Sequence, residues 1–227
     1  MILQLPLSAF YPENSPFRTD EFFVKNPTIE DEDRLFNPDR IKAGKAVDDF
    51  VRGLIDENAR KEYNRMYLID RNFIIYAVRV AMFGENVELK ESIECPSCGS
   101  LIKEATLDSE VYIPENKDFI LETDDYKIKF KLLTVADQNV MTKDPLMKSN
   151  FLTRTLYYLI DTIEKEGSPP EDKYSMIRKM PIRMSSKIRE FLETSYPKFD
   201  VFMKCGVCGE KIKYEIDESF FWYSLQQ

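Results

Sequence analysis

The sequence predicts an α+β protein, with a helical N-terminal part, strands around two cysteine pairs, and further helices between those pairs. Three observations support this class. Apolar residues recur at helical spacing up to about residue 84, alternate with charged residues on both sides of each cysteine pair, and return to helical spacing between the pairs. Hydrophobic residues make up 43% of the 227-residue chain and occur along its whole length, so a sizeable core is expected rather than disorder.

The N-terminal region reads as an arm followed by helices. The segment Leu5–Pro16 holds three prolines and shows no clear period, which predicts an extended arm laid on a surface. Thr28 can cap a helix with an acidic first turn, Glu30–Asp33, where carboxylates meet the positive end of the helix dipole. A second helix is expected over about Ala43–Asp56, whose apolar residues follow a three-four spacing.

A third helix is the clearest, because apolar residues recur at i, i+4, i+8 and i+11 and a glycine follows the last of them. Gly84 stands where a left-handed C-cap is wanted. The apolar stripe consists of Ile69, Phe73, Ala77 and Val80, widened by Ile74 and Ala81.

Between the cysteine pairs the pattern predicts a hairpin and then helices. Two alternating runs flank a polar turn within Phe119–Leu133. Phe151–Ile163 carries a broad apolar face that is typical of a helix. A shorter helix follows, capped by Ser185 or Ser186 and ended by Pro197.

Both cysteine pairs have the form C-x-x-C-G and lie between runs that alternate like strands, so each pair is expected at the tip of a hairpin. Two residues between thiolates let both sulfurs reach one ion, and the following glycine permits a positive φ where the chain turns back. Two such hairpins facing each other form a zinc ribbon. The expected ligands of one structural Zn²⁺ per chain are Cys95, Cys98, Cys205 and Cys208.

Four thiolates complete a tetrahedral shell and leave no position for water or substrate, so the expected role of the metal is structural. The alternative is two independent buried or redox-active thiol pairs, although a redox motif would need a βαβ context that the pattern lacks. The expected organisation is an N-terminal arm and helical subdomain at 1–85, a split zinc ribbon at 86–108 and 198–227, and an inserted hairpin and helical region at 109–197.

The composition argues against several functions. The chain has no histidine, which removes Ser-His-Asp and Cys-His catalysis, and it has no P-loop, GxGxxG or HExxH motif, so an enzyme is not expected. An enzyme that uses Asp, Glu or Lys for acid–base catalysis is the alternative, but the sequence shows no paired-carboxylate constellation for it. The net charge of −8 argues against general affinity for nucleic acid or anionic membrane. No apolar stretch approaches the ~20 residues that span a bilayer, and no signal peptide is visible. A cytosolic protein is expected, in which paired cysteines bind metal rather than form disulfides.

Three further features have two interpretations each. The acidic run Glu30–Asp33 is a metal or basic-partner site or, more commonly, a solvated first helical turn. Lys127, Lys129 and Lys131 share one strand face, which contacts an acidic partner or simply faces water. The cluster Phe220–Trp222 is an interface anchor or core packing beneath the ribbon.

The order of motifs along the chain is similar to that of one known family. The motifs are an arm with Leu5-Pro6 and Tyr11-Pro12, a threonine before acidic residues and a leucine at Thr28–Leu35, a helix at Ile41–Asp48, a helix with Asp70 and Arg79 that ends at Phe83-Gly84, the pair Cys95 and Cys98, the segment Phe130–Thr134, and a C-terminal Cys-x-x-Cys-Gly followed by Phe220-Phe221. Together they resemble the T4-type baseplate hub assembly proteins of contractile-tailed bacteriophages.

The resemblance implies a structural or assembly component of the baseplate hub region that acts by protein–protein docking. Its implied partners are baseplate or hub proteins, and no enzymatic activity is carried over. The implied location is the host cytoplasm during assembly and, for a member that stays in the particle, the virion tail baseplate. The rival interpretation is a nucleic-acid-binding zinc ribbon, since Lys204, Lys211 and Lys213 lie near the second pair, although neighbouring glutamates offset them. The oligomeric state does not follow from the sequence.

Overall fold

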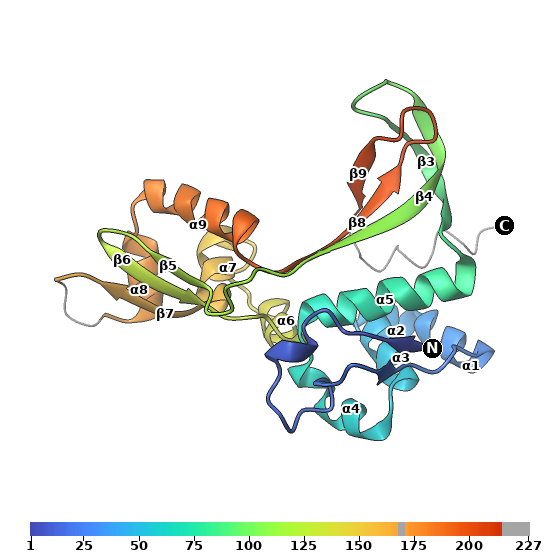
Figure 1. Ribbon diagram of the computed structural model, residues 1–227, viewed down its shortest axis with the longest axis horizontal. Coiled ribbons are helices and arrows are strands. Elements are labelled where there is room, and N and C mark those ends of the chain that lie inside the picture. The colour runs from blue at the N-terminus through green and yellow to red at the C-terminus, as the bar shows by residue number, and fades with distance from the viewer. Residues whose placement is uncertain (168–170, 215–227) are drawn as a thin grey trace. The chain divides into compact units, whose positions relative to one another are not determined.

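The computed structural model describes residues 1–167 and 171–214, and Figure 1 labels its helices and strands. The chain forms two compact units, which are described separately. The first consists of Met1–Tyr63, Ile69–Tyr112 and the described residues from Lys198 onward, and the second of Asn64–Leu68 and Ile113–Pro197. The fold is α+β with antiparallel sheets, as the sequence predicts. The predicted cluster Phe220–Trp222 lies outside the described residues.

The first unit begins with two short paired strands and a set of helices. Strand β1 (Ile2–Leu3) pairs with β2 (Phe22–Phe23), and a 3-10 turn, η1 (Ser8–Phe10), lies between them. The helices that follow are α1 (Ile29–Leu35), α2 (Pro38–Lys42), α3 (Ala46–Leu54), α4 (Glu57–Glu62) and, after the 3-10 turn η2 (Tyr63–Arg65), α5 (Leu68–Phe83). Helix α5 ends at Gly84, whose φ of 76° is the left-handed C-cap that the sequence predicts.

The N-terminal arm is part of the core, which corrects the expectation of an arm laid on a surface. Leu7 and Phe17 are fully buried, and Leu5 and Tyr11 are almost so. The Leu7 amide donates to Asp70 Oδ1 at 2.8 Å, so the arm is bonded to the first turn of α5. Three prolines break regular structure without exposing the chain, because the apolar side chains between them still bury their surface.

Helix α1 begins at the predicted cap. Thr28 and Asp31 form a capping box, in which each side chain accepts from the backbone amide of the other residue. The acidic first turn is not wholly solvated, because Asp31 is buried and pairs with Lys25 at 3.0 Å and with Arg34 at 3.4 Å. The acidic run is therefore partly a structural feature of this helix.

A four-stranded antiparallel sheet completes the first unit. Its strand order is β3-β4-β8-β9, and seven residue pairs join the two central strands, from Thr106 opposite Lys204 to Tyr112 opposite Lys198. The Phe199 ring packs edge-on against Phe73 of α5, with 5.6 Å between ring centroids. The strand bounds are β3 (Asn86–Glu94), β4 (Leu101–Tyr112), β8 (Lys198–Lys204) and β9 (Lys211–Tyr214).

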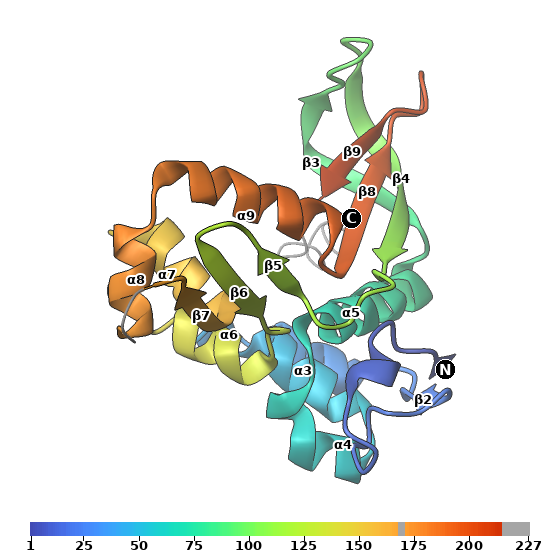
Figure 2. The ribbon, with the colours of Figure 1, turned by 60° about the vertical axis from the view of Figure 1, so that its left-hand side comes forward.

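The second unit holds a three-stranded antiparallel sheet and four helices. The strand order is β5-β6-β7, and α9 packs on this sheet (Figure 2). The Phe191 ring is stacked on the Phe130 ring, with 5.1 Å between ring centroids. The elements are β5 (Ile120–Glu122), β6 (Tyr126–Phe130), α6 (Val135–Met141), α7 (Phe151–Leu159), β7 (Ile160–Lys165), α8 (Lys173–Lys179) and α9 (Ile182–Thr194).

Two predictions for the second unit are wrong. The expected helix over Phe151–Ile163 stops at Leu159, and the chain continues as strand β7, which pairs with β6. Neither Ser185 nor Ser186 caps a helix, because α9 begins at Ile182 and contains both serines. No helix in the described part of the chain is long and apolar enough to cross a membrane.

Candidate metal centre

Each cysteine pair sits in a tight turn at the tip of a hairpin. In the turn that joins β3 to β4, the Cys95 amide donates to the Ser100 carbonyl and the Gly99 amide donates to the Cys95 carbonyl, both at 2.9 Å. Gly99 has a φ of 70°, which reverses the chain after Cys98 and which a residue with a Cβ adopts only with strain. We call this turn, residues 95–100, the first knuckle.

The second knuckle, residues 205–210, repeats this geometry between β8 and β9. The Cys205 amide donates to the Glu210 carbonyl and the Gly209 amide to the Cys205 carbonyl, again at 2.9 Å. Gly209 has a φ of 75°. The same local motif, C-x-x-C-G, therefore produces the same backbone turn twice in one chain, as expected for a zinc knuckle.

The sheet brings the two knuckles together. Strands β4 and β8 are antiparallel neighbours, and β4 leaves the first knuckle at the end where β8 enters the second, so both turns lie at one end of the sheet (Figure 1). The four sulfurs lie within 4.8 Å of one another. Two distances are short: 3.6 Å between Sγ of Cys95 and Cys208, and 3.8 Å between Sγ of Cys98 and Cys205.

These separations fit a tetrahedral zinc site. Four sulfurs placed about 2.3 Å from a central Zn²⁺ lie about 3.8 Å from each other. A disulfide would need about 2.05 Å between sulfurs, and all four thiols are free. Cys95 and Cys205 are buried while Cys98 and Cys208 are exposed, so the ion would lie near the surface with each knuckle supplying one inner and one outer ligand.

The thiols also influence one another's ionisation. The Ser100 hydroxyl lies 3.3 Å from Cys98 Sγ, and together with the Ser100 amide it lowers the pKa of Cys98 to about 6. The Glu210 amide favours the Cys208 thiolate, but the neighbouring thiols and burial outweigh it and raise the pKa of Cys208 to about 12. One thiolate therefore forms readily and opposes the next. A dication at the centre removes this opposition, because it stabilises every thiolate that binds it.

The lysines beside the second knuckle are engaged in cross-strand ion pairs. Lys204 and Lys211 both pair with Asp108, at 3.0 and 2.9 Å, and Lys213 pairs with Asp200 at 2.6 Å. Hydrogen bonds from Lys211 and Lys204 lower the pKa of Asp108 to about 2. The positive charge near the metal centre is thus matched, within the same sheet, by carboxylates on β4 and β8.

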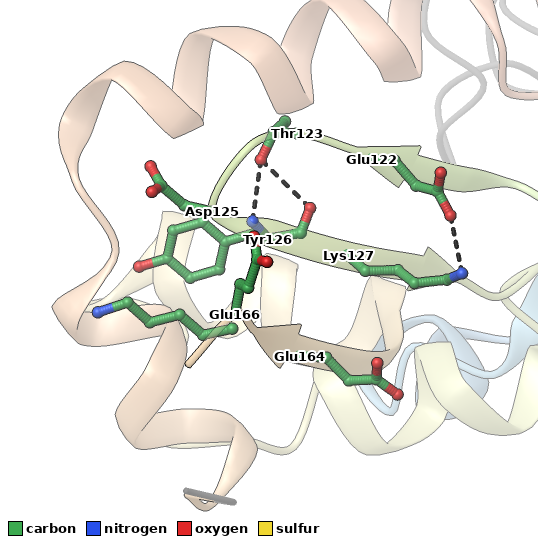
Figure 3. A pocket seen from close by; sticks show the side chains of 8 residues that line it. Glu122, Thr123, Asp125, Tyr126, Lys127, Glu164 and Glu166 are labelled. Atoms are coloured by element: carbon green, nitrogen blue, oxygen red, sulfur yellow. Dashed lines mark hydrogen bonds and ion pairs between the residues drawn. The ribbon is translucent and has the colours of Figure 1, made fainter. Parts of the chain in front are cut away.

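Two residues of the predicted lysine row, Lys127 and Lys129, lie on β6, and Lys131 follows its end. Lys127 and Lys129 are exposed between buried residues, so they share one strand face as the alternation predicts. Lys127 points toward Glu122 at the rim of a pocket in the second unit, and the two form an ion pair at 2.7 Å (Figure 3). Lys131 pairs with Asp137 at 2.6 Å.

Two buried residues of α5 with ionisable side chains, Asp70 and Arg79, hold neighbouring segments of the first unit. The Arg79 guanidinium donates to the carbonyls of Gly84 and Asn86, and so fixes the turn through which the chain enters β3. Asp70 holds the arm, as described above. Sequence reasoning did not assign these structural roles. The available signal was that both charges lie in a helix whose other residues are largely apolar, where a charge must find a partner inside the protein.

The whole chain was compared with known proteins. No curated protein and no solved structure matches it. A sequence family described as T4 bacteriophage base plate protein matches residues 20–222, which include both knuckles and nearly all of the described structure. The chain therefore belongs to the T4 bacteriophage base plate protein family.

Proposed function

We propose that this chain is a structural or assembly component of the hub region of a contractile-tail baseplate, and that one structural Zn²⁺ holds it in a form that docks to other baseplate proteins. The observation that carries this proposal is the closed cluster of four cysteines. Cys98 and Cys205 are 107 positions apart in the chain, yet their sulfurs are 3.8 Å apart. A metal at this point fastens two hairpins that a long insertion separates.

The chemistry of the ligands supports a structural role. Zn²⁺ bound by four thiolates has no open position, so it neither activates water nor polarises a substrate. What it supplies is cross-linking: the relative orientation of the two hairpins becomes fixed, and with it the surface that they present. Such a fixed surface suits a protein that binds partners by shape, because the conformational entropy of the surface is lost when zinc binds and not again when the partner binds.

A second candidate function is nucleic-acid binding by the zinc ribbon. The charge distribution favours protein partners instead. The three lysines near the second knuckle are paired with Asp108 and Asp200, and the chain as a whole carries a net charge of −8. Phosphate binding needs unpaired cations in a cluster. Salt-dependent binding of DNA or RNA at physiological ionic strength would revive this candidate.

The docking function is tested by removing the chain from a phage that encodes it. An amber mutant grown in a non-suppressing host is expected to accumulate heads and to lack complete tails, and a plasmid copy of the wild-type gene is expected to restore both tails and plaques. A plasmid carrying Cys95→Ser with Cys205→Ser should fail to restore them. Normal tails in the amber mutant would contradict the proposed function.

A further inference from the structure

Exposed apolar side chains gather in one part of the second unit. Thirteen large hydrophobic residues are exposed in the described part of the chain, and four of them fall between residues 140 and 152. This density is unlike the scatter of single exposed residues that is normal for a protein surface. The four are Val140 at 56% exposure, Leu146 at 44%, Phe151 at 68% and Leu152 at 50%.

One of these residues, Val140, lines a pocket at the junction of α6 and α7. The pocket has a volume of about 360 Å³, and Val140, Pro145 and Tyr158 are among the residues that line it. Phe151 lies seven positions before Tyr158, so both project from the same side of α7. We call Val140, Pro145, Leu146, Phe151 and the pocket wall at Tyr158 the α6–α7 surface.

A buried ion pair holds this surface in shape. Asp144, in the connection between the two helices, pairs with Arg154 of α7, and the Asp144 side chain is only 4% exposed. The Tyr158 hydroxyl and the Leu146 amide also donate to Asp144, at 3.0 and 2.9 Å. The exposed apolar residues are therefore displayed on a connection whose conformation is already fixed, which reduces the entropy lost when a partner binds.

The charge around the α6–α7 surface indicates what covers it. Asp144 and Arg154 cancel each other, whereas the ammonium groups of Lys143 and Lys148 have no ion-pair partner among the residues that the structure describes. Both lysines are exposed. An acidic chain, with a net charge of −8, thus presents a locally basic, apolar surface at this point. A partner with carboxylates at the corresponding positions would be electrostatically complementary to these two ammonium groups.

We propose that the α6–α7 surface docks a segment of another baseplate protein, one that presents a large apolar side chain flanked by carboxylates. This inference rests on the docking function proposed above. The apolar side chain enters the pocket beside Val140 and Tyr158. The carboxylates meet Lys143, which lines the pocket, and Lys148, which follows in the same connection between the helices. A second copy of this chain, itself acidic, is the competing occupant, and the test below separates the two.

The test uses the amber mutant and plasmid complementation. Lys143→Glu with Lys148→Glu reverses the rim charge, and we expect it to lower plaque formation on the order of 100-fold, because like charges then face each other across the interface. Leu146→Ser with Phe151→Ser, which alters exposed side chains only, should act in the same direction. The matched control is Lys42→Glu with Lys187→Glu, the same charge change at exposed lysines outside the surface, and it should complement like wild type.

Suppressor mutations then identify the occupant. Plaques that arise on the Lys143→Glu, Lys148→Glu plasmid are expected to carry replacements of Asp or Glu in another tail gene. Suppressors that arise instead in this gene would indicate a second copy and overturn the inference, as would full complementation by both variants. If the amber mutant itself forms normal tails, the proposed function fails; if it does not, but the surface variants complement fully, only this docking inference fails. Equal unfolding temperatures of purified variant and wild-type proteins are required for the comparison.

Discussion

At the scale of single residues, Asp70 is the residue whose raised pKa most clearly makes the stability of the fold depend on pH. Its carboxyl is fully buried in the first turn of α5, and this burial, opposed only partly by hydrogen bonds from the Leu7 amide and the Tyr11 side chain, raises its pKa from 3.8 to about 7. In the unfolded chain Asp70 is ionised above about pH 4. Between about pH 4 and 7 the folded state therefore holds one proton more than the unfolded state, and stability falls as the pH rises through this window.

Asp70→Asn is expected to remove this pH dependence, because an amide of the same shape still accepts from Leu7 and does not titrate here. Relative to the variant, the wild type should lose up to ~4 kcal/mol of unfolding free energy between pH 4 and pH 7. Urea unfolding of both proteins at pH 4, 5, 6 and 7 measures the difference. A difference that stays constant across this range, or that grows in favour of the wild type at high pH, would contradict the account.

Residues also show where sequence reasoning works best. Thr28 and Asp31 stand three positions apart at the start of α1, and a capping box depends on that local spacing alone, so the cap was predictable. The burial of Asp31 was not, since it depends on the approach of α3, where a Cβ added at Gly53 would lie 3.4 Å from Asp31 Oδ1. Asp70 is a similar case: its partner Leu7 lies 63 positions away, and no local pattern joins the two.

At the scale of elements, the two knuckles depend on glycines in the left-handed region. Gly209→Ala places a Cβ at a φ of 75°, which costs about 1–2 kcal/mol although nothing lies within 4 Å of the added atom. The variant should give up zinc to a chelator at a lower chelator concentration than the wild type does. Competition against a coloured zinc indicator measures this.

Gly206→Ala provides a matched control in the same knuckle. The added Cβ again meets nothing within 4 Å, but the φ of Gly206 is not in the left-handed region. Its zinc retention should equal that of the wild type. Equal retention by Gly209→Ala and Gly206→Ala would show that the positive φ does not matter for the metal site.

Elements differ in how far their sequence determines them. The hairpins around the knuckles follow from the alternation of apolar and charged residues, and the existence and end of α5 follow from its apolar period and Gly84. The predicted stripe is not the buried face of α5. Ile69, Phe73, Ala77 and Val80 are only partly buried and Ala81 is exposed, whereas the buried residues are Asp70, Ile74, Ile75, Val78 and Arg79. In the segment Phe151–Ile163 the local sequence pattern does not decide where the helix ends. Ile160, Thr162 and Ile163 fit either period, and pairing with β6 decides for a strand, which their β-branched side chains favour. The arm is buried for a comparable reason, because tertiary packing overrides its lack of a local period.

At the scale of the whole molecule, the proposed Zn²⁺ would act as a cross-link between the two hairpins. Cys98 and Cys205 are 107 positions apart, and closing a loop of that length removes unfolded-state entropy worth ~4–5 kcal/mol in the simplest model. Removal of zinc by a strong chelator, with a reducing agent present, should lower the unfolding temperature by about 10 °C. Scanning calorimetry with and without the chelator measures the change.

A variant without the inner ligands serves as control for the chelator. Cys95→Ser with Cys205→Ser should unfold at the lower temperature already and should not respond to the chelator. If the wild type keeps its unfolding temperature after its metal has been removed, the cysteine cluster does not act as a stabilising cross-link.

The clustering of the four cysteines could be predicted at this scale, but the organisation of the binding surfaces could not. The C-x-x-C-G motif occurs twice in a chain without histidine, and the structure brings these four cysteines together as a possible metal site. The α6–α7 surface had no comparable signal. Phe151 and Leu152 read as the buried face of a helix, and only the structure shows that they are exposed while the Asp144 side chain is covered and paired with Arg154.

Metal analysis of the purified protein tests the central claim most directly. Protein that is folded, reduced and expressed without added metal should contain about one zinc per chain, and Cys95→Ser with Cys205→Ser should contain almost none. Folded, reduced wild-type protein that contains no zinc, and that takes up none when zinc is supplied, would contradict the account.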